Sequence, residues 1–301
     1  MTDLPDLHGG GTANAAEASA VGLSLGGNTV LAGVNLQLPS GAVLGLVGRN
    51  GAGKSALLCC LVGLAAPATG HCTLLGAPSL DLPDAVRARL GYVAQQPDLL
   101  DWLTGMQHLQ RIGTLYPGWD SDRALLLATQ LNLPLGTRAG LLSLGDQQKL
   151  SLVLALGHDP ELLLLDEPLA SLDPVSRRDV MRALFQRADG QPPRTVLISS
   201  HGLADLERVV SHLVFMRAGQ VQLAGEWDTL AEHLRLHTLP PWPPGAAAPP
   251  PLPGELHRCQ RDSHWLLLVD TRHSGAGHPH GAQAVGGQAL ALDDLFAVLN
   301  A

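Results

Sequence analysis

The amino-acid sequence predicts an α/β protein in which short buried strands alternate with helices. Three apolar runs, at residues 42–47, 162–165 and 195–199, carry this prediction. Continuous apolar runs of roughly four to eight residues are typical of parallel strands that are buried on both faces. The first run is followed by a glycine-rich turn and by a helical pattern over residues 55–64. A strand, a turn and a helix in this order indicate a parallel sheet covered by helices.

An antiparallel subdomain and a helical insertion extend this core. Residues 1–19 are small and polar and predict a disordered tail. Residues 21–38 predict a β-hairpin that turns at Gly26-Gly27-Asn28 and leads into the first parallel strand. Between residues 97 and 150, helical patterns such as that at 122–131 are separated by prolines. We therefore expect an all-helical insertion over this stretch.

The end of the chain predicts a small additional unit. A hairpin pattern around Ala218-Gly219-Gln220 closes the main domain, which we place at residues 20–236. Residues 237–256 are rich in proline and alanine and predict a linker. Residues 257–301 predict a small α+β subdomain, with a strand near Trp265 and a helix that ends near Leu299.

Composition argues against several classes of function. The net charge is -8 and no basic run stands out, so nucleic acid is not the expected partner. No apolar run approaches the roughly 20 residues that span a bilayer, and Asp3 and Asp6 stand where a secretory signal would carry positive charge. The four cysteines lack metal-binding spacing and fit a reducing cytoplasm. His273, His278 and His280 have no cysteine or acidic ligands at defined spacing, which favours a solvated loop over a metal site.

The turn after the first parallel strand fits the pattern G-x-x-x-x-G-K-S/T, a phosphate-binding loop. It reads Gly48-Arg49-Asn50-Gly51-Ala52-Gly53-Lys54-Ser55, and Ala56 follows it. The glycines let backbone N–H groups approach an anion in conformations that are closed to residues with a Cβ. Lys54 would place a positive charge against the β- and γ-phosphates of a nucleotide, and the Ser55 hydroxyl would ligate Mg²⁺. A glycine-rich turn without a ligand is the alternative, and the flanking strand and helix argue against it.

Two carboxylates, Asp166 and Glu167, directly follow the apolar run at 162–165. A buried strand would deliver Asp166 beside the phosphate loop, where it can hold Mg²⁺ through water. Glu167 would then orient and deprotonate an attacking water. Solvated acids at the end of a strand are the alternative, which becomes less favourable beside a phosphate loop.

The order of further motifs around these two resembles that of the ATP-binding-cassette (ABC) ATPases. The motifs are Gln95 at the end of Tyr92-Val93-Ala94-Gln95, the stretch Leu142-Ser143-Leu144-Gly145-Asp146-Gln147-Gln148, the stretch Ser171-Leu172-Asp173, and His201 after the apolar run at 195–199. They resemble, in that order, the Q-loop, the signature motif, the D-loop and the switch histidine of the family. The resemblance covers about residues 21–236. It implies a P-loop NTPase core that binds ATP and Mg²⁺.

The resemblance also implies roles for single residues. Residues 48–56 and Gln95 would contact the nucleotide, and Ser143 and the backbone of Gly145 would bind the γ-phosphate of ATP held by a second protomer. Glu167, His201 and Lys54 would be the catalytic groups. Ser55, Gln95 and Asp166 would hold the metal.

The chain departs from the family pattern in two places. Leu144 and Asp146 stand where glycine and glutamine are usual, while Ser143 and Gly145 are kept. ABC ATPases usually stack adenine on an aromatic residue before the phosphate loop, but no such residue occurs here before Tyr92. Leu25 occupies the approximate place, so we expect the site to discriminate poorly among bases.

Three stretches, at residues 101–104, 116–120 and 168–174, together with the ending at 290–296, resemble the ATPases of bacterial multidrug, bacitracin or acetoin-type exporters. This implies a subunit of an exporter that works as a homo- or heterodimer, lies on the inner face of the cell membrane and couples ATP to a separate integral membrane permease. Trp102 and Trp119 are either core aromatics of the insertion or residues that line the groove for the permease, and both readings stay open.

Three other functions compete with this one. A soluble ABC protein that acts on DNA or ribosomes typically has two cassettes or a long coiled-coil insertion, and this chain has neither. An ATP-binding regulatory module with little hydrolysis would agree with the altered signature but not with Glu167. A P-loop kinase gives no reason for the signature or for His201.

Overall fold

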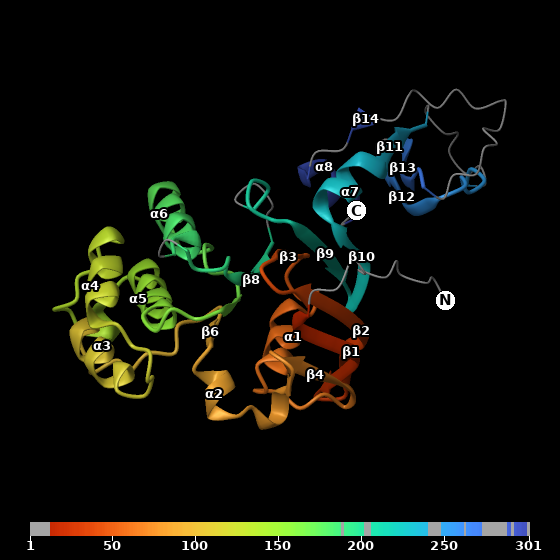
Figure 1. Ribbon diagram of the computed structural model, residues 1–301. Helices are drawn as coiled ribbons and strands as arrows, with labels where there is room; N and C mark the ends of the chain where they lie inside the picture. Colours follow the sequence, from red (N-terminus) through yellow and green to blue (C-terminus); the bar gives the residue numbers. More distant parts are fainter. Residues whose placement is uncertain are drawn as a thin grey trace. The chain divides into compact units, whose positions relative to one another are not determined.

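The computed structural model describes residues 13–187, 190–201, 206–239, 248–261, 263–272, 288–289 and 292–299. The chain divides into two compact units. The first contains residues 1–201 and 212–224, and the second contains residues 202–211 and 225–301. The first unit is an α/β structure with two sheets, as the apolar runs predict (Figure 1).

The larger sheet has six strands in the order β10-β9-β3-β8-β7-β6. Their bounds are β3 Val43–Val47, β6 Leu90–Val93, β7 Leu162–Leu165, β8 Thr195–Ser200, β9 His212–Arg217 and β10 Gln220–Glu226. Pairing is parallel from β6 through β7, β8 and β3 to β9. The carboxyl ends of β3, β7 and β8 therefore meet at one edge, which is where ligands bind in open α/β sheets.

The smaller sheet is antiparallel and has the order β2-β1-β4-β5. Its strands are β1 Asn14–Leu25, β2 Asn28–Pro39, β4 Thr69–Leu74 and β5 Ala77–Pro78. The predicted hairpin is present, with Gly26 and Gly27 at φ of 56° and 84° between β1 and β2. Residues 14–19, which the sequence places in a disordered tail, instead form the first half of β1. Ala15, Ala16 and Ala18 are buried there, but alanine is depleted in strands and gives no strand signal.

The helix α1 (Lys54–Leu61) joins the two sheets in one core. Its Leu57, Leu58 and Leu61 are fully buried and belong to the same apolar cluster as Leu38 of β2 and Leu44 of β3. Figure 1 shows α1 beside β1 and β4, as the contacts between these elements require. Because α1 begins at the phosphate loop, this packing fixes the loop to both sheets.

Helices connect the strands of the larger sheet. Before β6 lie a 3-10 turn at Ser79–Asp81 and α2 (Asp84–Arg87). Between β6 and β7 lie α3 (Gly105–Gly113), α4 (Ser121–Gln130), a 3-10 turn at Ala139–Leu141 and α5 (Leu144–Leu156), and α6 (Pro174–Phe185) follows β7. The helices α3, α4 and α5 pack on one another. The helix predicted at 122–131 is α4, displaced by one residue because Asp120 caps it by accepting from the Arg123 N–H.

The second unit contains an antiparallel sheet with the order β12-β13-β11-β14. Its elements are α7 Trp227–His233, β11 Leu234–Thr238, β12 Glu255–Arg261, β13 His264–Asp270, β14 Gln288–Ala289 and α8 Leu292–Leu299. The expected strand and helix of the C-terminal subdomain correspond to β13 and α8. Our boundary at residue 236 assigns α7 to the main domain, whereas the structure groups it with the second unit, because β11 directly follows α7 and pairs with β13. His273, His278 and His280 lie outside the described residues.

Candidate nucleotide site

A cavity of about 580 Å³ opens at the turn between β3 and α1. One wall consists of consecutive residues of the phosphate loop, namely Asn50, Gly51, Ala52, Gly53, Lys54, Ser55 and Ala56. Gln95, which follows β6, and Glu167, which follows β7, complete the polar lining. Residues that lie far apart in the sequence are thus brought to one place, at the carboxyl edge of the sheet.

The backbone of the loop requires glycine at defined positions. Gly51 and Gly53 have φ of 80° and 102°, in the left-handed region that other residues rarely adopt. A Cβ on Gly48 would lie 2.3 Å from the carbonyl oxygen of Met216. Glycine is thus required at these three positions. The loop leads directly into the N-terminus of α1, where free N–H groups and the helix dipole favour an anion.

Lys54 lies across the loop and is 5% exposed. Its Nζ donates to the carbonyl oxygens of Gly48 at 2.7 Å and Arg49 at 3.3 Å. It also forms an ion pair with Glu167, with 3.2 Å between Nζ and Oε1. A buried ammonium group needs such partners, and they keep its charge at the phosphate loop.

Asp166 and Glu167, which follow β7, both form hydrogen bonds with Ser199, a residue that the sequence analysis does not identify. The Ser199 Oγ donates to Asp166 Oδ1 at 2.5 Å and accepts from the Glu167 N–H at 2.9 Å. Ser199 is fully buried, and its only sequence signal is a hydroxyl near the end of an apolar strand.

Glu167 itself has a φ of 47°, unusual for a residue with a side chain. The Nδ1 of His201 contacts Glu167 Oε2. Lys54 and His201 therefore contact different oxygens of the Glu167 carboxylate.

The residues present suit a magnesium ion. Ser55, Gln95 and Asp166 offer a hydroxyl, an amide oxygen and a carboxylate, and oxygen ligands of this kind are those that Mg²⁺ takes. Among the described residues, no group of three or more histidine, cysteine or acidic side chains is arranged to hold a metal alone. Mg²⁺ commonly completes its shell with phosphate oxygens and water, so the donor set fits a metal that binds together with a nucleotide.

The opposite wall of the cavity is aliphatic. It contains Leu23, Leu25, Val30, Leu64 and Ala65. Among the described residues that line the cavity there is no aromatic ring. Leu25 is 58% exposed, so its side chain is accessible at the cavity mouth.

The signature residues lie at the N-terminus of α5 and do not line this cavity. Ser143 caps the helix by accepting from the Asp146 N–H at 3.1 Å, and its hydroxyl donates to Asp146 Oδ2 at 2.8 Å. A Cβ on Gly145 would lie 3.0 Å from the carbonyl oxygen of Ser171, so the signature and the Ser171-Leu172-Asp173 stretch are neighbours. Asp173 caps α6, and hydrogen bonds from the side chain and backbone of Ser176 lower its pKa to about 2.

The two tryptophans of the helical stretch have different environments. A Cβ on Gly113 or Gly157 would lie 2.6 or 2.5 Å from the Trp119 ring, so Trp119 fills the space between α3 and the end of α5. Trp102, in contrast, is 67% exposed. The nearby Leu141 is 78% exposed, and Gly140 beside it approaches Asp101. Trp102, just before α3, and Leu141, just before α5, therefore form an exposed apolar surface.

The chain is similar to known proteins. Residues 31–170 match the family model described as ABC transporter. The nickel import ATP-binding protein NikO of Rhodobacter capsulatus is 35% identical over 224 residues, which cover 69% of this chain and 88% of NikO. The chain belongs to the ABC transporter family. It is an ATP-binding subunit of that family and an ATPase.

Other relatives support the same assignment. The bacitracin transport ATP-binding protein BcrA of Enterococcus faecalis is 31% identical over 198 residues, 65% of this chain and 64% of BcrA. A solved ATP-binding subunit of an ABC transporter is 27% identical with a TM-score of 0.64, covering 72% of this chain and 92% of that one. The P-loop ABC ATPase fold predicted from the sequence is confirmed. No helix among the described residues is long and apolar enough to cross a membrane.

Proposed function

We propose that the cavity beside the phosphate loop is the ATP site of this ABC ATPase and that Glu167 is its catalytic base. The observation that carries the proposal is the contact of Glu167 with both Lys54 and His201 beside the phosphate loop. Glu167 removes a proton from the attacking water, while Lys54 and His201 balance the negative charge that develops on the γ-phosphate. The N–H groups of residues 48–56 bind the phosphates.

Mg²⁺ is the cofactor that this chemistry needs. Ser55, Gln95 and Asp166 would hold it, and when bound it neutralises charge on the β- and γ-phosphates. Asp166 is 2% exposed and its position is fixed by Ser199. The protein thus supplies one buried carboxylate in a fixed place, which favours a metal that arrives with the nucleotide.

The complete site would need a second protomer. Ser143 and Gly145 lie outside the cavity, at the N-terminus of α5, where a helix end binds an anion. In a dimer they would close over the γ-phosphate held by the partner. Closing and opening of that dimer would move the helices α3–α5 and so transmit the ATP cycle.

The other partner that we propose is an integral membrane permease. The exposed surface of Trp102 and Leu141 suits an apolar segment of that permease, and it would hold the ATPase at the inner face of the membrane. We propose export as the direction of transport, on the motifs that resemble multidrug and bacitracin exporters. The relatives include a nickel import protein and a Nod factor export protein, so the direction of transport is the part that most needs a test. All of them are named as transport or transporter ATP-binding proteins, which disfavours the regulatory and non-transport alternatives.

The proposal is tested by the Glu167→Gln variant. The amide keeps the shape of the carboxylate and loses the base, so steady-state phosphate release should fall by about 10²–10⁴-fold while ATP binding persists and an ATP-bound dimer accumulates. The matched control is Glu161→Gln, because Glu161 precedes the same strand but pairs with Arg89 at the surface. Near-normal hydrolysis by Glu167→Gln would contradict the role of Glu167.

A further inference from the structure

The hydroxyl of Ser143, which we assign to the γ-phosphate of a partner's ATP, is already engaged by an acidic neighbour. The Ser143 Oγ donates its hydrogen to Asp146 Oδ2 at 2.8 Å and accepts from the Asp146 N–H at 3.1 Å. A serine hydroxyl carries a single hydrogen, so it donates to one acceptor at a time. In this conformation Ser143 therefore has no hydrogen to offer to a phosphate oxygen.

Asp146 also places a negative charge at the N-terminus of α5, in the first turn of the helix. An acidic residue in this position stabilises a helix, because it offsets the positive end of the helix dipole. The same dipole attracts a phosphate to a helix N-terminus. A phosphate that approaches Ser143 would therefore meet a helix end whose charge Asp146 already balances.

Lys149 compensates the charge of Asp146 only in part. Its Nζ lies 3.4 Å from Asp146 Oδ1, whereas Oδ2 is the oxygen that accepts from Ser143. The side chains of Asp146 and Lys149 are 26% and 12% exposed, so solvent weakens the attraction between them. Ser143 is exposed, and an incoming phosphate and the Asp146 carboxylate would compete for its hydroxyl at the protein surface.

We propose that Asp146 weakens ATP-driven dimerisation, because its carboxylate competes with the γ-phosphate of the partner's ATP for the Ser143 hydroxyl. This inference rests on the proposed function, since it concerns the signature residues that close on the partner's nucleotide. For the phosphate to bind, the carboxylate must give up the hydroxyl and keep only its contact with Lys149. A symmetric homodimer closes two such sites, so it bears the competition twice, whereas a heterodimer with a chain that lacks this acid bears it once.

Sedimentation velocity of the full-length Glu167→Gln protein in Mg²⁺ and ATP, with and without Asp146→Asn, tests the proposal. The asparagine keeps the size of the side chain and removes the charge that opposes a phosphate. Asp146→Asn should lower the dissociation constant of the ATP-bound dimer at least about tenfold, because like charges brought together in an interface oppose association. In ADP, which has no γ-phosphate, the same substitution should leave the dimer fraction unchanged.

Two controls separate this effect from the stabilisation of α5 by Asp146. Asp122→Asn removes an exposed acidic residue from the first turn of α4 and should leave dimerisation unchanged. Thermal unfolding without nucleotide should show that Asp146→Asn leaves the unfolding temperature unchanged or lowers it, because the helix loses a favourable charge. A purely structural role of Asp146 therefore predicts an equal or weaker dimer, which is the opposite of the expected result.

The inference is overturned if the ATP-bound dimer of Glu167→Gln is no tighter with Asp146→Asn, or if the dimer tightens equally in ADP. Failure of the proposed function gives a different result. Glu167→Gln would then hydrolyse ATP at a near-normal rate, or neither protein would form an ATP-dependent dimer, and both the function and the inference would be wrong.

Discussion

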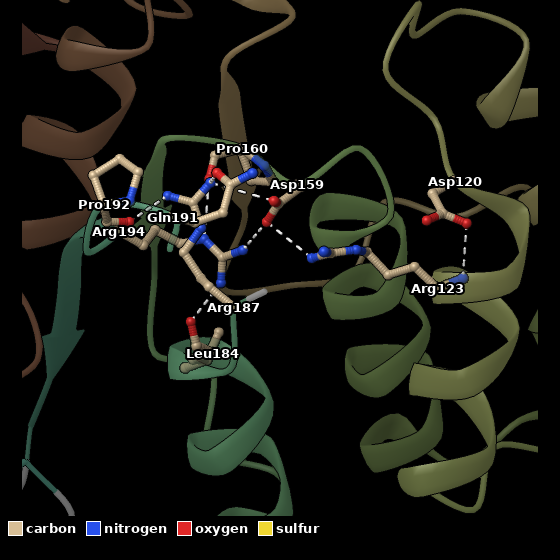
Figure 2. Close-up of polar contacts among 9 residues, drawn as sticks. All are labelled: Asp120, Arg123, Asp159, Pro160, Leu184, Arg187, Gln191, Pro192 and Arg194. Atoms are coloured by element: carbon tan, nitrogen blue, oxygen red, sulfur yellow. Dashed lines mark hydrogen bonds and ion pairs between the residues drawn. The ribbon is translucent and has the colours of Figure 1, made fainter. Parts of the chain in front are cut away.

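The cluster of Asp159 with Arg123, Arg187 and Arg194 gives the clearest stability prediction, because one substitution removes the shared partner of three cations. Asp159 lies in the turn between α5 and β7, and Figure 2 shows the guanidinium groups around it. Its Oδ1 accepts from Arg123 at 2.9 Å and from Arg194 at 2.5 Å, and its Oδ2 accepts from Arg187 at 3.2 Å.

In Asp159→Asn the carboxylate charge is lost while the shape and one acceptor oxygen are kept. Arg194, whose side chain is 1% exposed, would then be a buried cation without a counter-charge. Breaking a buried ion pair in this way costs about 3–5 kcal/mol. The contacts of Arg123 and Arg187 are more accessible to solvent and add about 0–1 kcal/mol each.

A loss of this size is large compared with the roughly 5–15 kcal/mol by which proteins are stable. For a unit of this length it corresponds to a fall of about 6–28 °C in the unfolding temperature. Hydrogen exchange of the amides in α5 and β7 reports on this unit separately from the second one. The matched control is Asp179→Asn, which removes a surface pair with Arg182 at 3.5 Å and should cost less than about 1 kcal/mol. Equal effects of the two substitutions would refute the reasoning.

The same cluster predicts a pH dependence. Burial tends to raise the pKa of Asp159, but Arg123, Arg187 and Arg194 outweigh that effect and hold the pKa below its usual range. A carboxyl whose pKa is lowered by folding stabilises the protein above its unfolded pKa, about 3.9, and that stabilisation is lost as the pH falls through the folded value. The difference in unfolding free energy between wild type and Asp159→Asn should therefore be constant from about pH 5 to 8 and should shrink below about pH 4.

Three further predictions concern the nucleotide site and the permease. Lys54→Ala should weaken ATP binding by about 10- to 150-fold in calorimetry, because a charge-assisted contact contributes about 1.5–3 kcal/mol, and unchanged affinity would contradict its role. ATP and GTP should bind with affinities within about tenfold of each other, because an aliphatic contact discriminates poorly among bases. Leu25→Tyr should tighten ATP binding by about 2- to 12-fold, because ring stacking adds about 0.5–1.5 kcal/mol. A strong preference for ATP over GTP in competition binding would contradict the proposed aliphatic base contact. Trp102→Glu should abolish co-purification with the membrane partner and leave basal phosphate release unchanged, whereas Leu115→Glu, at a residue that is 71% exposed, should affect neither.

Much of the main sheet is predictable because its strands are buried on both faces. The runs that form β3, β7 and β8 are almost wholly apolar, so they need no periodicity to be recognised. The glycines of the phosphate loop are equally informative, since the backbone at Gly51 and Gly53 admits few other residues. The strand β1 is harder to predict from the sequence. The buried residues of its first half are alanines, and its pairing with β2 and β4 is decided by tertiary contacts.

The parts of the site that the sequence does not predict depend on contacts between distant residues. Ser199 is an ordinary serine in sequence, and only the pairing of β7 with β8 brings its hydroxyl to Asp166. Asp159 likewise belongs to no motif, and its three arginines are separated from it by 28 to 36 positions. Trp102 and Trp119 are indistinguishable by residue type, and their exposure follows from the packing around Gly113 and Gly157.

The charges at the phosphate loop connect these observations to the need for a metal. Lys54 is the one cation among the described residues that line the nucleotide cavity, and it is opposed by Glu167 at 3.2 Å and by Asp166, the buried neighbour of Glu167 in the chain. A triphosphate that entered against two carboxylates and a single ammonium group would meet net repulsion. A divalent cation held by Asp166 would reverse this balance, which would also release Lys54 from Glu167 toward the phosphates. The pairing of Lys54 with Glu167 would therefore couple arrival of the metal–nucleotide complex to freeing of the proposed base, since the cation that holds Glu167 is the one that the phosphates attract.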